Sequence, residues 1–346
     1  MAETEALTDV MRLLRAWDAG ASEAGAPPAN TLGALGTAMR LGVGEPVAAA
    51  LEPRLPPAAA RLTLTPVRAA AARAAEAAAA QLASIGRALE AAGLSAVALK
   101  GAAFVAEQGR PAPWRPMVDL DLLVPRADLE AAVAALVAEG YAGEHAAHVA
   151  TDYHYPALLP SGPGLSVELH VDLGWRRTAP LDGLAARAAP GALPGLRVPT
   201  PGDRLAHLVH HAQIADGGHA ARVVPLRAAL DWRRLTRDAG ADPAAARARF
   251  DAAGLAPAFD AFAAFAAAVW DEPAPASPAA RRWAEDALAA LAEPGLAARR
   301  ARRFDPRRAF GALTEPRLMA HAAAVMLNPV RLRRLGRGLM DGLRAG

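Results

Sequence analysis

Residues 95–125 read SAVALKGAAFVAEQGRPAPWRPMVDLDLLVP, and the fold prediction starts from these residues. The apolar run that leads to Gly101 predicts a short buried strand, and residues 102–108 predict a short helix that opens at that glycine. Three prolines make the next segment a loop. The MVDLDLLV that follows alternates with period two. It predicts a second strand, with Asp119 and Asp121 on one face and the leucine between them on the other.

Downstream of this stretch, the pattern continues with a helix and two more strands. Residues 127–141 have the pattern of an amphipathic helix with acidic residues in its first turn. Residues 148–159 and 165–175 are strand-like, and the PSGPG between them is typical of a hairpin turn. The order of these elements predicts an α+β fold, with an α/β-type core built on a mixed sheet.

Helical patterns lie on both sides of this core. Apolar residues recur at three-to-four spacing before it, and helical patterns resume after Pro199. We therefore divide the chain into an N-terminal helical region at residues 1–80, a core at residues 81–200, and a C-terminal helical domain with a basic tail at residues 201–346.

The composition excludes several kinds of site. The chain has no cysteine, so disulfides, thiolate nucleophiles and cysteine metal sites are excluded. Hydrophobic residues make up 53% of the chain, which argues against wholesale disorder. The N-terminus lacks the apolar region of a signal peptide, and no apolar run approaches the roughly 20 residues of a membrane-spanning helix. We therefore expect a cytoplasmic protein with no membrane partner.

Basic residues gather at the C-terminal end, although the net charge is only +3. From Arg299 onward the chain reads RRARRFDPRR and later RLRRLGRG. Such a segment attracts nucleic acid, acidic lipid or phosphate, but it is more often a solvated helical face. Nucleic acid therefore stays open as a partner without being the expected one.

The paired aspartates carry the chemistry. On a strand, the carboxylates of Asp119 and Asp121 project from one face, where they repel each other unless a cation lies between them. Mg²⁺ suits such a pair because it prefers hard oxygen ligands and leaves positions for water and phosphates. An ion pair with Arg115 is the alternative. Glu168, in the middle of the SVELHVDL strand, is a candidate third carboxylate, and His170 shares its face.

Lys100 is the only lysine in the chain, and the other 37 of its 38 Lys and Arg residues are arginine. It directly precedes Gly101, where a strand gives way to a helix. A glycine at this position lets backbone N–H groups approach an anion, and a compact ammonium delivers point charge to a phosphate.

Together these segments resemble the uncharacterised nucleotidyltransferase family of the polymerase-β-type nucleotidyltransferase superfamily. The resemblance rests on LKG at residues 99–101, RPMVDLDLLV at residues 115–124 and VELHVDL at residues 167–173. It covers roughly residues 82–240, within which the order and spacing of the motifs are more specific than any one of them.

The superfamily pattern places a Gly-Ser pair after the first strand, then two alternating acids, then a third acid on another strand. Gly101 matches the glycine, Asp119 and Asp121 match the pair, and Glu168 matches the third acid. Alanines occupy the place of the serine, which leaves Lys100 as the substitute phosphate contact.

The resemblance implies an enzyme that uses Mg²⁺ or Mn²⁺ and a nucleoside triphosphate, with ATP expected. Asp119, Asp121 and Glu168 are the expected catalytic metal ligands. Lys100, Gly101, Arg115 and His170 are expected to contact the nucleotide. The implied reaction moves a nucleoside monophosphate to a hydroxyl or phosphate of a small-molecule or peptide acceptor and releases pyrophosphate, with Glu168 helping to take the acceptor proton.

Three alternatives remain open at this point. Because the serine is absent, the chain could be a catalytically inactive nucleotide-binding module of the same fold. The basic C-terminus could instead serve a nucleic-acid-binding protein. A metal-dependent phosphohydrolase could use the same acids, and it would release phosphate rather than pyrophosphate.

Two further features lie on the C-terminal helices. His207 and His211 have the i,i+4 spacing of metal ligands but lack the glutamate of zinc proteases, so we expect packed or nucleotide-facing histidines. We expect Asp231 to form an ion pair with Arg227 or Arg234.

Overall fold

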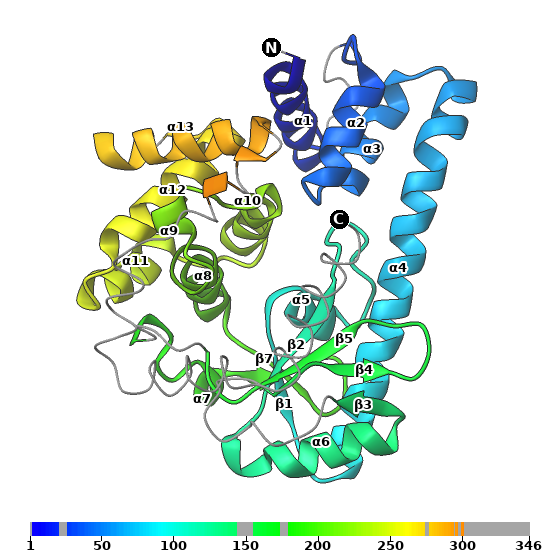
Figure 1. The fold of residues 1–346 in the computed structure, drawn as a ribbon, viewed down its shortest axis with the longest axis vertical. Coiled ribbons are helices and arrows are strands. Elements are labelled where there is room, and N and C mark those ends of the chain that lie inside the picture. Colours follow the sequence, from blue (N-terminus) through cyan, green and yellow to red (C-terminus); the bar gives the residue numbers. More distant parts are fainter. Residues whose placement is uncertain are drawn as a thin grey trace, which may run out of the picture.

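The structure is a computed structural model, shown in Figure 1. It describes residues 2–20, 26–143, 155–173, 179–273, 277–293, 295–296 and 299–300. Nearly all of the basic tail, and most of the predicted strand at residues 148–159, lie outside these ranges.

A mixed seven-stranded sheet forms the core, in the order β3-β4-β5-β2-β1-β7-β6. The strands are β1 (Ala96–Ala98), β2 (Asp119–Leu123), β3 (Tyr141–Gly143), β4 (Leu158–Pro160), β5 (Ser166–His170), β6 (Ala189–Pro190) and β7 (Leu196–Val198). Strands β2 and β5 run parallel, as do β1 and β7, and the other neighbouring pairs are antiparallel. This confirms the predicted mixed sheet and α+β fold.

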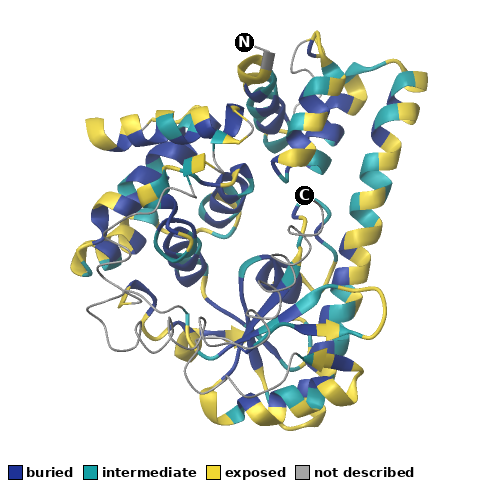
Figure 2. Cartoon of the chain, viewed as in Figure 1, coloured by how far each residue is buried: buried dark blue, intermediate teal, exposed yellow. Residues whose placement is uncertain are grey.

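Four helices accompany the strands: α4 (Pro57–Ala91), α5 (Lys100–Gln108), α6 (Leu129–Ala138) and α7 (Leu184–Arg187). One face of the sheet packs on α4, α5 and α6, with Leu120 and Leu122 of β2 in the shared core. The opposite face packs on α7 through a smaller cluster that contains Leu123. Figure 2 shows the central strands buried, whereas α4 and α6 expose their outer faces.

The remaining helices form a second body of packed helices. They are α1 (Ala2–Asp18), α2 (Thr31–Arg40), α3 (Gly44–Leu51), α8 (Pro201–His210), α9 (Gly218–Ala221), α10 (Leu226–Arg233), α11 (Pro243–Ala252), α12 (Ala256–Trp270) and α13 (Pro278–Ala292). Side chains of α1 to α3, of α8 and of α10 to α13 belong to one hydrophobic core. Helix α4 runs from this helical body to the sheet (Figure 1) and crosses the predicted boundary at residue 80.

The structure differs from the sequence prediction around the first strand. Strand β1 ends at Ala98, and α5 begins at Lys100 rather than at residue 102. Lys100 therefore lies at a helix N-terminus and not at the end of a strand. The strands β3, β6 and β7 are additions, and each is too short to show a sequence period.

Candidate active site

The three predicted acids gather on one face of the sheet. In the parallel pairing of β2 and β5, Asp121 lies opposite Glu168 and Asp119 lies opposite Ser166. The side chains between the acids, such as that of Leu120, point into the core on the other face. The acids therefore lie on the same face of the sheet as the smaller hydrophobic cluster that packs against α7.

Asp121 is the centre of this group. Its side chain is 2% exposed, and its Oδ1 accepts hydrogen bonds from Lys100 Nζ at 2.7 Å and His170 Nε2 at 2.9 Å. Burial by itself raises the pKa of Asp121, but the hydrogen bonds from His170 and Lys100 outweigh it and hold the pKa well below its usual range. Asp121 is therefore a carboxylate at neutral pH.

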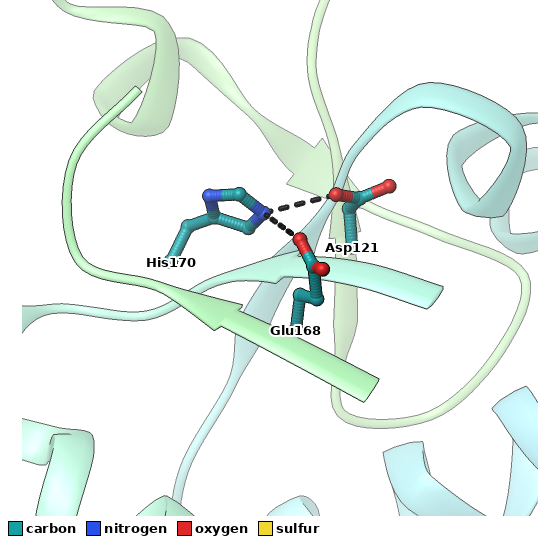
Figure 3. A group of neighbouring side chains, drawn as sticks. All are labelled: Asp121, Glu168 and His170. Atoms are coloured by element: carbon teal, nitrogen blue, oxygen red, sulfur yellow. Dashed lines mark hydrogen bonds and ion pairs between the residues drawn. The ribbon is translucent and has the colours of Figure 1, made fainter. Parts of the chain in front are cut away.

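Asp121, Glu168 and His170 could hold a metal ion. One possible ligand atom from each lies within 4.8 Å of the others, and the His170 ring points at both carboxylates (Figure 3). The distance from His170 Nε2 to Glu168 Oε2 is 3.7 Å. Asp119 is not in this group, although it lies on the same face of the sheet. Burial and the charge of Asp121 raise the pKa of Asp119, so a nearby cation would stabilise the charged form of Asp119.

Lys100 has a strained backbone. Its φ is 48°, in the left-handed region, and only Arg222 and Asp271 share a positive φ among the described non-glycine residues. Its side chain is 24% exposed and reaches the buried Asp121. Strain of this kind persists where the surrounding structure holds it and is common at functional sites.

Gly101 allows a close approach behind Lys100. A Cβ added to it would lie 2.7 Å from Met117 Cγ and 3.7 Å from Arg115 Nη1. The absent side chain thus lets the loop before β2 pack on the first turn of α5.

Arg115 is engaged in a buried ion pair. Its Nε donates to both carboxylate oxygens of Asp231, at 2.7 and 2.9 Å, and its Nη1 donates to the carbonyl of Pro116. The expectation that Asp231 pairs with Arg227 or Arg234 was wrong. Its ion-pair partner is Arg115, which lies 116 positions away in sequence. A contact between Arg115 and phosphate stays a prediction.

A cleft of about 1030 Å³, partly open to solvent, lies between this end of the sheet and the C-terminal helices. Lys100, Gly101 and Asp119 line it on the sheet side. The residues that line it on the helical side include Arg204, His207, His211, Asp216, Arg227 and Asp231. Among the charged groups, Lys100 pairs with Asp121 and Arg204 with Glu107.

The family model described as uncharacterised nucleotidyltransferase matches residues 35–271. The chain belongs to this nucleotidyltransferase family. The match extends beyond the predicted 82–240 and includes the helices that line the cleft. Comparisons with curated proteins and with solved structures gave no significant match. Within the described part of this nucleotidyltransferase, no helix combines the length and the apolar character needed to cross a membrane.

Sequence reasoning missed Arg227 as a site residue. Arg227 lines the cleft of the nucleotidyltransferase, and within the described ranges it makes no ion pair or hydrogen bond through its guanidinium. Burial and the charge of Arg115 lower its pKa, whereas the nearby Asp119 raises it. The only sequence signal for Arg227 was its position one helical turn before Asp231. We interpreted that spacing as an ion pair between the two side chains.

The two histidines on α8 and the turn after it also face the cleft. His207 is buried, and its burial, together with the neighbouring His211, lowers its pKa well below the usual value, so it is neutral. The two rings meet edge to face with centroids 6.0 Å apart. Within the described part of the chain, neither belongs to the candidate metal group.

Proposed function

We propose that this nucleotidyltransferase transfers a nucleoside monophosphate from a nucleoside triphosphate, with ATP expected, to a hydroxyl or phosphate of a small-molecule or peptide acceptor. The single observation that carries the proposal is the register of β2 and β5. It aligns Asp121 with Glu168 and keeps Asp119 on the same face, and Asp119 lines a cleft whose walls include Lys100 and Arg227.

The acids fit a divalent cation. Their oxygens are the ligands that Mg²⁺ and Mn²⁺ prefer. The possible ligand atoms of Asp121, Glu168 and His170 lie within 4.8 Å of one another, compared with the about 4.2 Å that separates two opposite ligands of one small ion. Asp119, Asp121 and Glu168 would hold the metal, and His170 would orient the Asp121 carboxylate by its hydrogen bond. When bound, such an ion neutralises phosphate charge and lowers the pKa of a coordinated hydroxyl.

The chain supplies further groups for the triphosphate. Lys100 lies 2.7 Å from Asp121 and opens α5, whose first N–H groups have no partner within the helix. Arg227 brings a guanidinium to the opposite wall of the cleft. Because Arg115 is held by Asp231, we assign the second phosphate contact to Arg227 in preference to Arg115.

The reaction balances as a substitution at the α-phosphorus. An acceptor oxygen bonds to the α-phosphorus, the bond from that phosphorus to the bridging oxygen breaks, and pyrophosphate leaves. Lys100 and Arg227 stabilise the charge that gathers on the departing phosphates. A proton on the acceptor must pass to a base.

The test measures ATP binding and pyrophosphate release in the presence of Mg²⁺ or Mn²⁺. We expect Asp119→Asn combined with Asp121→Asn to reduce pyrophosphate release by at least about 10²-fold. Asp128→Asn, a partly exposed acid directly before α6, is the matched control and should leave the rate unchanged. Arg227→Gln should weaken ATP binding by about tenfold or more.

Three results would contradict the proposal. Binding of ATP without release in any acceptor pool would indicate an inactive binding module. Release of phosphate instead of pyrophosphate would indicate a phosphohydrolase. Pyrophosphate release at the wild-type rate in the variant with both Asp119→Asn and Asp121→Asn would show that the activity does not depend on these acids.

A further inference from the structure

A π-helical turn follows α8 and joins two polar residues of the cleft. It covers His211–Ala215, and its closing hydrogen bond runs from Asp216 N to His211 O at 2.9 Å, five residues apart. An α-helical turn would close four residues apart and would place Ala215 beneath His211 instead. Single π turns are rare and are frequently found at functional sites.

The π turn brings the two side chains together. The distance from His211 Nδ1 to Asp216 Oδ2 is 3.2 Å. Within the described ranges, no other hydrogen bond or ion pair involves the His211 ring. Both residues line the cleft, on the wall that faces Lys100 and Asp119, and the His211 side chain is 32% exposed. The buried His207 ring packs on it edge to face and restricts its movement.

This arrangement has the chemistry of an oriented base. A carboxylate at one ring nitrogen fixes the tautomer of a histidine and leaves the other nitrogen as a proton acceptor. It also stabilises the imidazolium that forms when the proton arrives. The acids on the sheet are less suited to this task, because Asp121 is held by Lys100 and His170 and the expected metal would occupy the others.

On the basis of the proposed function, we propose that His211, positioned by Asp216, is the general base of the transfer and that the natural acceptor is a hydroxyl. A phosphate acceptor is already ionised at neutral pH and needs no base, whereas a hydroxyl must lose its proton. The proton passes from the acceptor O–H to a nitrogen of His211, the oxygen bonds to the α-phosphorus, and pyrophosphate leaves. The imidazolium then returns its proton to water.

The test uses the full chain with labelled ATP and Mg²⁺. Glycerol and N-acetylserinamide serve as hydroxyl probes, and inorganic phosphate serves as the phosphate probe. We expect transfer to a hydroxyl probe, and we expect His211→Gln to slow it by about 10² to 10⁴-fold while ATP affinity stays unchanged. Added imidazole should restore part of the rate in His211→Ala, which a merely structural histidine would not allow.

Asp216→Asn tests the positioning role. It should slow transfer in the wild-type background and have little further effect in the His211→Gln background, because the two residues act as a unit. The matched control is Asp238→Asn at the end of the other described π turn, Arg234–Asp238, whose carboxylate lies outside this cleft. This control should leave the rate unchanged.

The outcomes separate the two proposals. A normal rate in His211→Gln, or wild-type transfer to phosphate but to neither hydroxyl probe, would overturn the role of His211 while leaving the nucleotidyltransferase assignment intact. No pyrophosphate release from the wild-type chain, or no effect of the Asp119 and Asp121 substitutions, would contradict the proposed function itself.

Discussion

At the scale of single residues, Lys100 combines three features that meet nowhere else in the described structure. It is the only lysine in the chain, its backbone is left-handed, and its ammonium contacts the buried Asp121. The ammonium occupies the side of Asp121 where a metal or a phosphate-bound metal is expected. Its compact shape allows both the contact with Asp121 and a contact with an arriving phosphate, whereas a planar guanidinium has a wider fork.

We therefore predict that Lys100→Arg loses about tenfold to 100-fold of the pyrophosphate-release activity, even though the charge is kept. Steady-state rates at saturating ATP measure the effect. Arg126→Lys is the control at an exposed position and should be neutral. A normal rate in Lys100→Arg would show that the reaction does not require a lysine rather than an arginine at this position.

Arg115 shows the limit of residue-scale prediction from sequence. The motif RPMVDLD suggested that Arg115 serves the acids nearby, but the fold pairs it with Asp231 on α10. A sequence pattern indicates neighbours three or four positions apart on a helix, and it carries no signal for a partner 116 positions away.

At the scale of elements, strands β2 and β5 could be predicted because each has five residues with a polar and apolar alternation. Their parallel pairing, which creates the acid cluster, could not be predicted from the pattern of either strand. Strands of two or three residues such as β6 and β7 could not be predicted, because their pairing is set by neighbouring strands rather than by their own pattern.

The contact of α4 with the turn before β7 leads to a prediction about Gly86. A Cβ at Gly86 would lie 2.2 Å from the carbonyl oxygen of Pro194 and 3.1 Å from Leu196 Cγ. Because backbone cannot yield as a side chain can, Gly86→Ala should lower the free energy of unfolding by about 2–3 kcal/mol, despite the better helix propensity of alanine. Urea denaturation measures the change.

Gly36→Ala is the matched substitution in α2. A Cβ there meets nothing within 4 Å, so this variant should gain up to about 1 kcal/mol. If both variants shift the denaturation midpoint in the same direction, the close packing of α4 on this turn does not determine the effect.

At the scale of the whole molecule, the candidate site lies where the sheet meets the helical body. The division at residues 80 and 200 stays a prediction, but the helices on either side of the sheet region in sequence share one hydrophobic core. The acids could be predicted as site residues from the sequence, because the period-two alternation of a strand places Asp119 and Asp121 on one face. The sequence did not predict Arg227 or the pairing of His211 with Asp216 as parts of the site, because their cleft forms only when distant helices pack together.

Asp203 connects the two bodies. Its fully buried carboxylate on α8 accepts hydrogen bonds from Arg187 of α7 and Arg249 of α11, at distances between 2.5 and 3.0 Å. The Thr200 hydroxyl donates to it as well, at 2.7 Å, and caps the helix. Asp203→Asn removes the charge that these groups share, so it should lower the free energy of unfolding by about 3 kcal/mol at pH 7.

The same residue predicts a pH dependence of stability. Burial raises the pKa of Asp203, but the hydrogen bonds from Arg187, Arg249 and Thr200 outweigh burial and place it below the usual value of about 3.9. As the pH falls, the unfolded chain therefore takes up this proton first, so the contribution of Asp203 is complete above pH 4 and is lost as the pH falls through the folded pKa. Urea titrations of wild type and Asp203→Asn at a series of pH values should show the difference in unfolding free energy shrinking below about pH 4. Asp251→Asn, a substitution of an exposed acid on α11, is the control, and its unfolding free energy should follow that of the wild type at every pH. A difference between wild type and Asp203→Asn that stays constant down to low pH would refute the role of the Asp203 charge.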